Sequence, residues 1–359
     1  MPVLLFVFAK MDLTGNEHNS VEGFVLKFNL QKIAEDLNVS ISTVSRALND
    51  KQGVNKETKE RILDYVNAHT TGLSNHLVQS IGLVDTYSRH KIDSYYLSYL
   101  LEGVDERLHA FGYNTMLIHS DQIDQQWHTL GGCPVLKAQQ GIVWMEPLFD
   151  EEYLALLKRY NLPCVVINNY KPDVPVDSIK SDNYSASRKG IEFLVNHGHS
   201  NIGFVGGYLN LTNHKDRYAG FVDGIQSAGL NLVEQWIIDD IVAWNDTGGA
   251  EGMHRLLSLK ERPTVVMLAS DLLAVGCYKA AQDHGVRIPD DISIISFDDA
   301  PFAEHLNPRL TTFQQPLLKI GVAAAERLIA LLMGKQADEV QHTLINCPLI
   351  VRDSIATLS

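Results

Sequence analysis

The sequence predicts a small all-α N-terminal domain followed by an α/β body built on parallel sheets. Two observations support this fold class. Residues 30–49 contain two short helical patterns separated by a tight turn, and from residue 80 onward short apolar runs alternate with amphipathic stretches. Such alternation implies parallel strands covered by helices. A chain of 359 residues is also too long for one hydrophobic core, so we expect two or three domains.

The N-terminal pattern predicts a helix, a turn and a second helix. The first helix places three apolar residues on one face, Ile33, Ala34 and Leu37. Asn38 falls at the turn, where asparagine tolerates a left-handed backbone better than most residues. Ser40 is a suitable N-cap for the second helix, because its hydroxyl can accept from free backbone N–H groups. That helix is predicted to bury Val44, Ala47 and Leu48.

The outer surface of the second helix is rich in short polar side chains. Its first turns and outer face carry Ile41, Ser42, Thr43, Ser45, Arg46 and Asn49. Hydroxyl groups can contact bases or phosphates, and arginine can form two hydrogen bonds with guanine. A rigid helix with this surface fits the major groove of DNA. The alternative is an ordinary amphipathic hairpin, which the coincidence of so many independent features disfavours.

These residues resemble the DNA-binding headpiece of the lactose repressor (LacI/GalR) family. The resemblance runs through Ile33-Ala34, Val39-Ser40, the segment 43–46 and Leu48-Asn49, and it continues over 54–63 as a third helix. It implies that Ile41, Ser42 and Arg46 read bases and that Thr43, Ser45 and Asn49 contact the DNA backbone. The sequence departs from the family in having Lys32 where an acidic residue is usual, and Leu37-Asn38 in place of Ala-Gly.

The resemblance also divides the chain into segments. It implies a headpiece at residues 26–66, a hinge at 67–80 and a two-lobed domain for effector binding and dimerisation at 81–359. Residues 1–25 precede the usual start of the family, so we expect a disordered leader or an upstream start-site assignment. In the family a hinge leucine enters the minor groove, and the candidates are Leu73 and Leu77. The hinge lacks the usual Pro and Arg, and the alternative is that Leu77 packs on the body.

The alternating pattern of the body predicts its strands and helices. Strands are expected at 81–85, 114–119, 141–145, 164–168, 202–206, 235–239, 265–269 and 292–297. Helices are expected at 96–110, 185–197, 217–228, 248–258, 271–284 and 318–333. The body resembles the periplasmic-binding-protein-like core of the same family, carried by segments 198–204, 217–221, 270–271, 288–293 and 349–353. This resemblance implies two lobes with a ligand cleft between them.

Six polar or aromatic residues are candidates for binding an effector. Strand ends in open α/β folds collect such groups, and a sugar needs carboxylates, amides, arginine and an aromatic face. The candidates are Asp93, Asn168, Arg217, Trp244, Ser270 and Asp298. The resemblance assigns effector contact to Arg217, hydroxyl binding to Asp298 and sugar stacking to Trp244. The alternatives are a surface ion pair for Arg217, a cap for Asp298, core packing for Trp244, and ordinary loop roles for Asp93, Asn168 and Ser270.

Composition limits the classes of function. Of the net charge of −13, residues 81–359 carry −12, whereas 26–80 carry +1, which argues against non-specific coating of nucleic acid. The cysteines are far apart without metal-ligand spacing and indicate free thiols in a reducing compartment, Cys133, Cys164, Cys277 and Cys347. The chain has no G-x-S-x-G, no P-loop and no G-x-G-x-x-G after a strand, so we expect no catalytic residue, metal or cofactor.

The function predicted from these observations is that of a cytoplasmic, homodimeric transcription repressor. Two heads would read a pseudo-palindromic operator, and a small-molecule sugar would control operator affinity, with no membrane partner. By resemblance to repressors of galactosidase operons, the effector is expected to be galactose or a galactoside. Three alternatives remain open: a repressor that senses a purine or sugar phosphate, a sugar-binding protein without DNA function, and a sugar-modifying enzyme. Whether the ligand releases or tightens DNA binding is also open.

Overall fold

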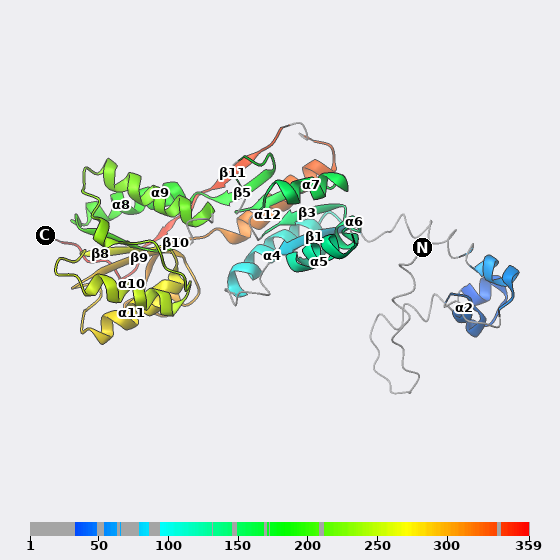
Figure 1. Cartoon of the computed structure of the whole chain (residues 1–359), viewed down its shortest axis with the longest axis horizontal. Helices are drawn as coiled ribbons and strands as arrows, with labels where there is room; N and C mark the ends of the chain where they lie inside the picture. Colours follow the sequence, from blue (N-terminus) through cyan, green and yellow to red (C-terminus); the bar gives the residue numbers. More distant parts are fainter. Residues whose placement is uncertain are drawn as a thin grey trace. The chain divides into compact units, whose positions relative to one another are not determined.

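The chain divides into two units, residues 1–78 and residues 79–359. The structure is a computed structural model (Figure 1), and it describes residues 33–48, 54–62, 65, 79–85, 94–130, 132–145, 149–168, 171, 173–207, 212–335 and 339–358. Within these residues, none of the helices is long and apolar enough to cross a membrane.

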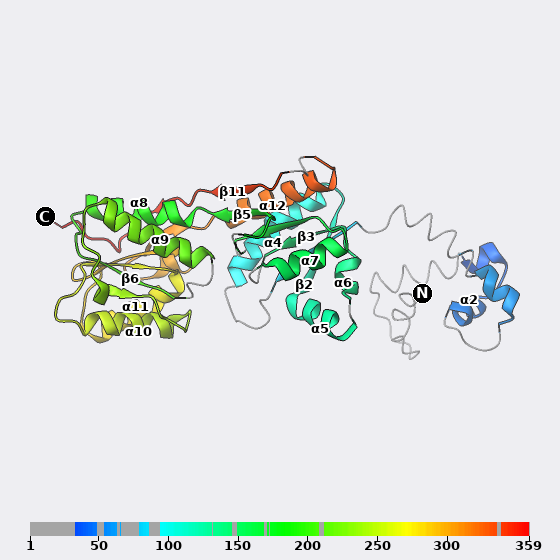
Figure 2. The ribbon, with the colours of Figure 1, turned by 45° about the horizontal axis from the view of Figure 1, so that its top comes forward.

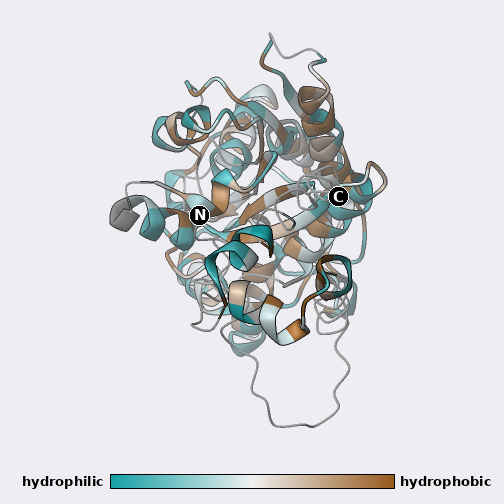
Figure 3. Cartoon of the chain, turned by 90° about the vertical axis from the view of Figure 1, so that its right-hand side faces the viewer, coloured by the Kyte–Doolittle hydropathy of each residue, from teal (hydrophilic) through white to brown (hydrophobic). Residues whose placement is uncertain are grey.

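The N-terminal unit has a small helical core. Residues 33–37 and 56–62 are helical, and helix α2 spans Ile41–Leu48. Four side chains form the centre of this core, and partly buried neighbours pack against them: Ala34, Val44, Ala47 and Ile62, then Ile33, Leu37, Val39 and Val54. The predicted inward faces are therefore confirmed, except for Leu48, whose side chain lies outside the described residues. The headpiece helices carry hydrophilic and hydrophobic residues on the same turns (Figure 3).

The body contains two six-stranded sheets, and the first defines what we call the first lobe. Its order is β11-β5-β4-β3-β1-β2, and its paired strands are all parallel. The strands are β1 (Ser80–Asp85), β2 (Asn114–His119), β3 (Gly141–Trp144), β4 (Cys164–Ile167), β5 (Asp177–Ser181) and β11 (His342–Ile345). The strand β2 lies at one edge of this sheet and β11 at the other.

Helices cover both faces of the first sheet. Helices α4 (Ser94–His109) and α12 (Leu317–Leu332) share one apolar cluster with the strands (Figure 2). A second cluster joins the sheet to α5 (Ser120–Leu130), α6 (Pro134–Lys137) and α7 (Glu151–Arg159). The lobe is therefore a three-layer α/β/α unit, as the alternation of strands and helices predicts.

The second sheet defines the second lobe. Its order is β12-β10-β9-β8-β6-β7, parallel except where β12 runs against β10. The strands are β6 (Ile202–Val205), β7 (Ile237–Ile238), β8 (Val265–Leu268), β9 (Ser293–Asp298), β10 (Thr311–Gln314) and β12 (Leu349–Ile350). One apolar cluster includes α8 (Asn183–Asn196) and α9 (Thr212–Ser227), and another includes α10 (Asp246–Leu257) and α11 (Asp271–Asp283).

The chain passes between the lobes three times. It does so from β5 to α8, from β10 to α12, and from β11 to β12. Each lobe is thus built from segments that are far apart in the sequence. The predicted fold class, a helix-turn-helix headpiece followed by a two-lobed core with parallel sheets, is confirmed.

Two glycines let α4 and α12 touch backbone to backbone. A Cβ on Gly103 would lie 2.3 Å from the carbonyl oxygen of Leu318, and one on Gly321 would lie 2.5 Å from that of Leu100. Only glycine allows this approach without moving a helix. The crossing joins α4 to α12, although the two helices are more than two hundred residues apart.

The structure also differs from the sequence predictions. The alternation of apolar runs and amphipathic stretches did not predict seven elements of the structure, namely β5, β10, β11, β12, α5, α6 and α7. The strand β5 reads Asp-Ser-Ile-Lys-Ser, and its polar residues Asp177, Ser178 and Ser181 are buried with hydrogen-bond partners. A pattern of apolar residues cannot identify such a strand, because distant partners make its burial possible. The strand predicted at 235–239 is instead a 3₁₀ turn, Glu234–Trp236, followed by the two residues of β7.

Candidate DNA-reading helix and effector site

The turn of the headpiece has the geometry that its residues predict. Asn38 adopts a left-handed conformation with φ 53°, and the backbone N–H of Val39 donates to the carbonyl of Ala34 at 2.9 Å. The hydroxyl of Ser40 accepts from the backbone N–H of Thr43 at 3.0 Å. This contact satisfies one of the free donors at the start of α2 and fixes the direction of the helix.

The outer face of α2 presents the predicted DNA-contacting side chains to solvent. Ile41 is 48% exposed although it is large and apolar, and Ser42 and Arg46 are also exposed. Thr43 is half-buried, and its hydroxyl lies 2.7 Å from that of Ser40. The side chain of Ser45 and the residues Asn49, Leu73 and Leu77 lie outside the described part of the chain.

Three of the predicted effector residues meet at the strand ends of the second lobe. Arg217, on α9, donates from Nη2 to Asp298 Oδ1 at 3.0 Å, and Asp298 is the last residue of β9. Ser270, which follows β8 and caps α11, donates to Asp298 Oδ2 at 2.7 Å. The guanidinium of Arg217 also lies 4.7 Å from the centre of the Phe297 ring. The site is polar, charged and largely buried, since the side chains of Arg217 and Asp298 are 5% and 12% exposed.

A second carboxylate, Asp271, lies beneath this group. It is fully buried and accepts from the hydroxyl of Thr312 at 2.8 Å and from the backbone N–H of Ala300 at 2.9 Å. Burial, with the charge of Asp298, raises the pKa of Asp271 to about 8. Burial also raises the pKa of Asp298, but Arg217 opposes that shift. Burial therefore favours the protonated form of both carboxyl groups, and the charge of Arg217 favours the ionised form of Asp298.

Asn168 lies in the first lobe, directly after β4, with a left-handed φ of 64°. It is fully buried, and its amide donates to the hydroxyl of Tyr96 and accepts from the backbone N–H of Ser181 at 3.4 Å. Both ends of the amide thus contact protein groups. This geometry favours its alternative role as a loop hydrogen-bonding residue. Asp93 lies outside the described residues.

Trp244 lies between β7 and α10 and is half-buried. Its ring stacks on that of His214, with centroids 4.0 Å apart and planes inclined by 17°. His214 lies one turn before Arg217 on α9, so the aromatic pair and the guanidinium belong to one face of that helix. Trp244 also packs against both apolar clusters of the second lobe.

Two residues that the sequence analysis missed connect these candidates. Asn183 Oδ1, at the start of α8, accepts from Arg217 Nε at 2.9 Å and from Gln315 Nε2 at 3.1 Å. Gln315 Oε1 in turn accepts from the hydroxyl of Ser181 at 2.5 Å. Gln315 follows a strand directly, and the strand-end criterion that selected Asp298 would have selected it if β10 had been predicted.

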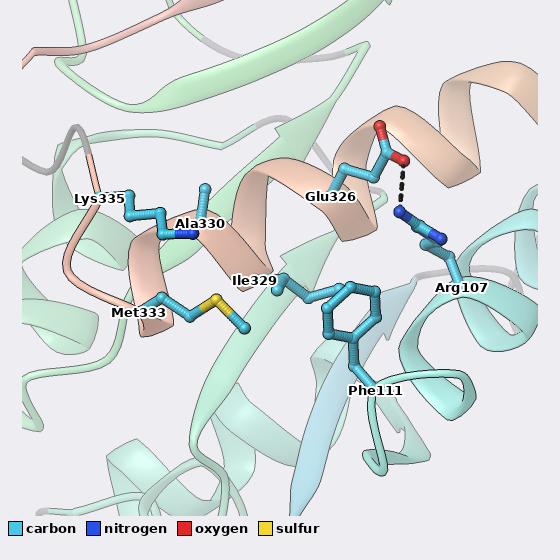
Figure 4. A pocket seen from close by; sticks show the side chains of 7 residues that line it. All are labelled: Arg107, Phe111, Glu326, Ile329, Ala330, Met333 and Lys335. Carbon is cyan, nitrogen blue, oxygen red and sulfur yellow. Dashed lines mark ion pairs between the residues drawn. The ribbon is translucent and has the colours of Figure 1, made fainter.

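A shallow pocket lies elsewhere, on the first lobe between the ends of α4 and α12 (Figure 4). Arg107 pairs with Glu326 at 2.9 Å beside it, and Phe111 and Met333 are partly exposed. None of the effector candidates lines this pocket, which separates it from the group around Arg217.

Comparison with known families supports both parts of this description. Residues 29–70 match the model of bacterial regulatory proteins of the lacI family, and residues 191–355 match a periplasmic binding protein-like domain. The chain belongs to the LacI family. The match covers α2 and its turn, and the second match covers Arg217, Trp244, Ser270 and Asp298.

Relatives of this LacI-family protein extend over nearly the whole chain. Catabolite control protein A of Priestia megaterium is 28% identical, over 88% of this chain and 95% of the relative. The repressor PurR of Haemophilus influenzae (strain PittEE) is 27% identical, over 92% of this chain and 99% of the relative. A solved structure titled transcriptional regulator CelR-cellobiose complex is 22% identical, with a TM-score of 0.68, and covers 90% of this chain and 99% of its own. The protein is a DNA-binding transcription regulator, and its relatives are regulators rather than enzymes.

Proposed function

We propose that this LacI-family regulator is a cytoplasmic repressor whose affinity for operator DNA is controlled by a sugar. The observation that carries the proposal is the group formed by Arg217, Ser270 and Asp298, together with the half-buried Trp244, which stacks on His214 one turn before Arg217 on α9. A guanidinium and a carboxylate can hold pairs of sugar hydroxyls, and an aromatic ring can cover the apolar face of a sugar ring. Galactose or a galactoside is the proposed effector.

The chemistry of Arg217 supports this assignment. A guanidinium has five N–H donors. Within the described residues, Arg217 donates from Nε to Asn183, from Nη1 to the backbone carbonyl of Ala269 and from Nη2 to Asp298. These contacts hold the guanidinium in a fixed plane, and donors remain for a ligand. A ligand hydroxyl that bridged Arg217 and Asp298 would meet both charges in one orientation, which is the geometry that sugar recognition requires.

The DNA-binding part of the proposal assigns the headpiece to residues 26–66 and the hinge to 67–80. Ile41, Ser42 and Arg46 are proposed to read bases, and their exposure on α2 is compatible with that role. The remaining proposed DNA contacts are Thr43, Ser45, Asn49, Leu73 and Leu77. Because DNA half-sites mirror protein symmetry, two copies of the chain would bind a pseudo-palindromic operator.

The proposed homodimer would use the β2 edge of the first lobe. Four large apolar side chains are 41–45% exposed there, on α4, on the turn after it and on the edge strand: Tyr99, Phe111, Met116 and Leu117. Exposed apolar residues beside an open strand edge favour association, and a second copy is the partner that the two-headed reading of DNA requires.

A purine is the second candidate effector. The relative from Haemophilus influenzae is named PurR, and the stacked pair of Trp244 and His214 offers an aromatic surface that a planar base could also use. Sugar and purine differ in how they use Asp298, because the carboxylate would accept from hydroxyls in one case and from ring or amino N–H groups in the other.

Thermal denaturation of the protein with single ligands tests the effector assignment. Galactose, lactose, cellobiose, ribose, guanine and hypoxanthine are the probes, and a ligand that binds the folded state raises the midpoint. A shift with galactose or lactose that is absent in Asp298→Asn supports the proposal. A shift with a purine alone replaces the sugar by the second candidate.

Selection of bound sequences from random DNA tests the operator assignment. The protein should enrich a two-fold symmetric site, and Arg46→Ala should weaken binding to that site by about 1–3 kcal/mol. Arg61→Ala is the matched control, since Arg61 is exposed on the third helix and carries the same charge. Equal loss in both variants would mean that Arg46 contributes only charge.

A further inference from the structure

Gln315 lies where the chain crosses from the second lobe to the first, between β10 and α12. It is 5% exposed, and both ends of its amide are engaged. Nε2 donates to Asn183 Oδ1 at 3.1 Å, while Oε1 accepts from the hydroxyl of Ser181 at 2.5 Å. Ser181 ends β5 on another crossing segment, so this side chain joins two of the three connections between the lobes.

The amide of Asn183 also has a fixed direction. Its Oδ1 accepts from both Gln315 Nε2 and Arg217 Nε, and its Nδ2 donates to Asn213 Oδ1 at 3.2 Å and to the carbonyl of Ser181 at 3.5 Å. If this amide turned over, an N–H₂ group would face two other donors. A buried donor without an acceptor is unfavourable, so the donor on Gln315 helps to keep the oxygen of Asn183 pointed at Arg217.

The chain of contacts continues into the first lobe. The backbone N–H of Ser181 donates to Asn168 Oδ1 at 3.4 Å, and Asn168 donates to Tyr96 on α4. At the other end Arg217 reaches Asp298 and Ser270. Gln315 occupies the middle of this series, where the two lobes meet.

We propose that Gln315 is a positioning residue, which holds the guanidinium of Arg217 through Asn183 and links it to the lobe junction at Ser181. It does not contact the effector. A change in the contacts of Arg217 is transmitted through the two amides to the crossing segment that ends β5. This coupling role rests on the proposed function of Arg217 as an effector contact, whereas the positioning role can be measured without any ligand.

The first test measures how well Arg217 is held in the free protein. The variant is Gln315→Met, which has a similar length, cannot donate and accepts only weakly. The readout is the exchange rate of the Nε proton of Arg217 by NMR, with the signal assigned through Arg217→Lys. We expect exchange about tenfold faster than in wild type, which corresponds to about 1.4 kcal/mol and lies in the range for the loss of a buried hydrogen bond.

Two further variants provide a control and a second way to remove the hydrogen bond from Gln315 to Asn183. Gln314→Met is the matched control, since the neighbouring glutamine is exposed and bonds to Asp299 at 2.8 Å, outside the series. Gln315→Glu keeps an acceptor for Ser181 but loses the donor to Asn183, so it should accelerate exchange as Gln315→Met does. Exchange unchanged in both Gln315 variants, or accelerated equally by Gln314→Met, would overturn the positioning role.

The second test measures the link to DNA with galactose as the probe. The quantity is the ratio of operator dissociation constants with and without saturating galactose. In Gln315→Met, the factor by which galactose changes the dissociation constant should be at least fivefold smaller than in wild type. Gln314→Met should leave this factor unchanged. A wild-type ratio kept in Gln315→Met overturns the coupling role. Wild-type protein that ignores galactose refutes the effector proposal instead, and the proton exchange then decides the positioning role by itself.

Discussion

Lys180 and Asp216 form an ion pair of 2.6 Å that joins the two lobes of the body. Lys180 lies on β5 of the first lobe, and Asp216 lies on α9 of the second, next to Arg217. Their side chains are 17% and 25% exposed, so solvent screens the pair only in part. The two lobes are therefore connected by an ion pair as well as by the hydrogen bonds of Gln315 with Asn183 and Ser181.

Breaking this ion pair should loosen the lobes. In Lys180→Met we expect the distance between spin labels on exposed positions of α4 and α10 to become more broadly distributed than in wild type. High salt should produce a smaller change of the same kind in wild type. Lys279→Met is the control, since Lys279 pairs with Asp283 within α11 and does not join the lobes. Identical distributions in the wild type and Lys180→Met would refute the prediction.

Removing the guanidinium of Arg217 should destabilise the body strongly. Arg217→Met leaves the buried carboxylate of Asp298 without its cation, and the expected loss is about 3–5 kcal/mol in the free energy of unfolding. Urea denaturation measures this loss. The double variant Arg217→Met with Asp298→Asn should recover part of the stability, because no charge then remains uncompensated. A single variant as stable as wild type would show that water reaches the site.

Stability should depend on pH through Asp271. Its pKa is raised by burial from 3.8 in the unfolded chain to about 8 in the folded protein, so folding takes up a proton between these values. The stabilisation is fully present below about pH 4 and is lost as the pH rises through 8. Relative to Asp271→Asn, wild type should therefore lose stability steadily from pH 5 to pH 8.

The control for this pH dependence is Asp283→Asn. The ion pair with Lys279 lowers the pKa of Asp283, so its contribution has the opposite sign and is lost as the pH falls. Parallel stability curves for wild type and Asp271→Asn over this range would contradict the prediction.

The N-cap of α2 should be required for DNA binding. Ser40→Ala removes the acceptor for the N–H of Thr43 and should destabilise the headpiece by about 1 kcal/mol, with weaker operator affinity. Ser40→Asp, which can accept the same hydrogen bond, should restore the helix. Asn55→Ala removes the corresponding contact to Thr58 on the third helix and measures the effect of headpiece stability alone. Affinity equal in Ser40→Ala and wild type would exclude a role for the cap.

A charge on the β2 edge should prevent the proposed dimer. Leu117 is 44% exposed on this strand, and Leu117→Asp should convert a dimer to a monomer in light scattering after size exclusion. Leu344→Asp is the matched control, because Leu344 is 54% exposed on β11 at the opposite edge of the same sheet. A dimer that survives Leu117→Asp but not Leu344→Asp would place the interface at the other edge.

The candidate site was only partly predictable from sequence. Ser270 and Asp298 follow from the strand-end rule and Arg217 from the resemblance to the lactose repressor family, and the structure brings them within hydrogen-bonding distance. Asn183 and Gln315 escaped that rule, because they lie on segments whose strands contain too few apolar residues to be recognised.

The sequence by itself determined the headpiece and the strongly apolar strands. In the headpiece the contacts are local, so the order of Ala34, Asn38, Ser40 and Val44 is enough to specify a helix, a turn and a helix. Only the tertiary structure decided β5 and β10 and the polar contacts at their ends. Ser181 and Gln315 are 134 residues apart, and the hydrogen bond between their side chains satisfies a buried polar group on each. Such pairing leaves no periodic trace in the sequence around either residue.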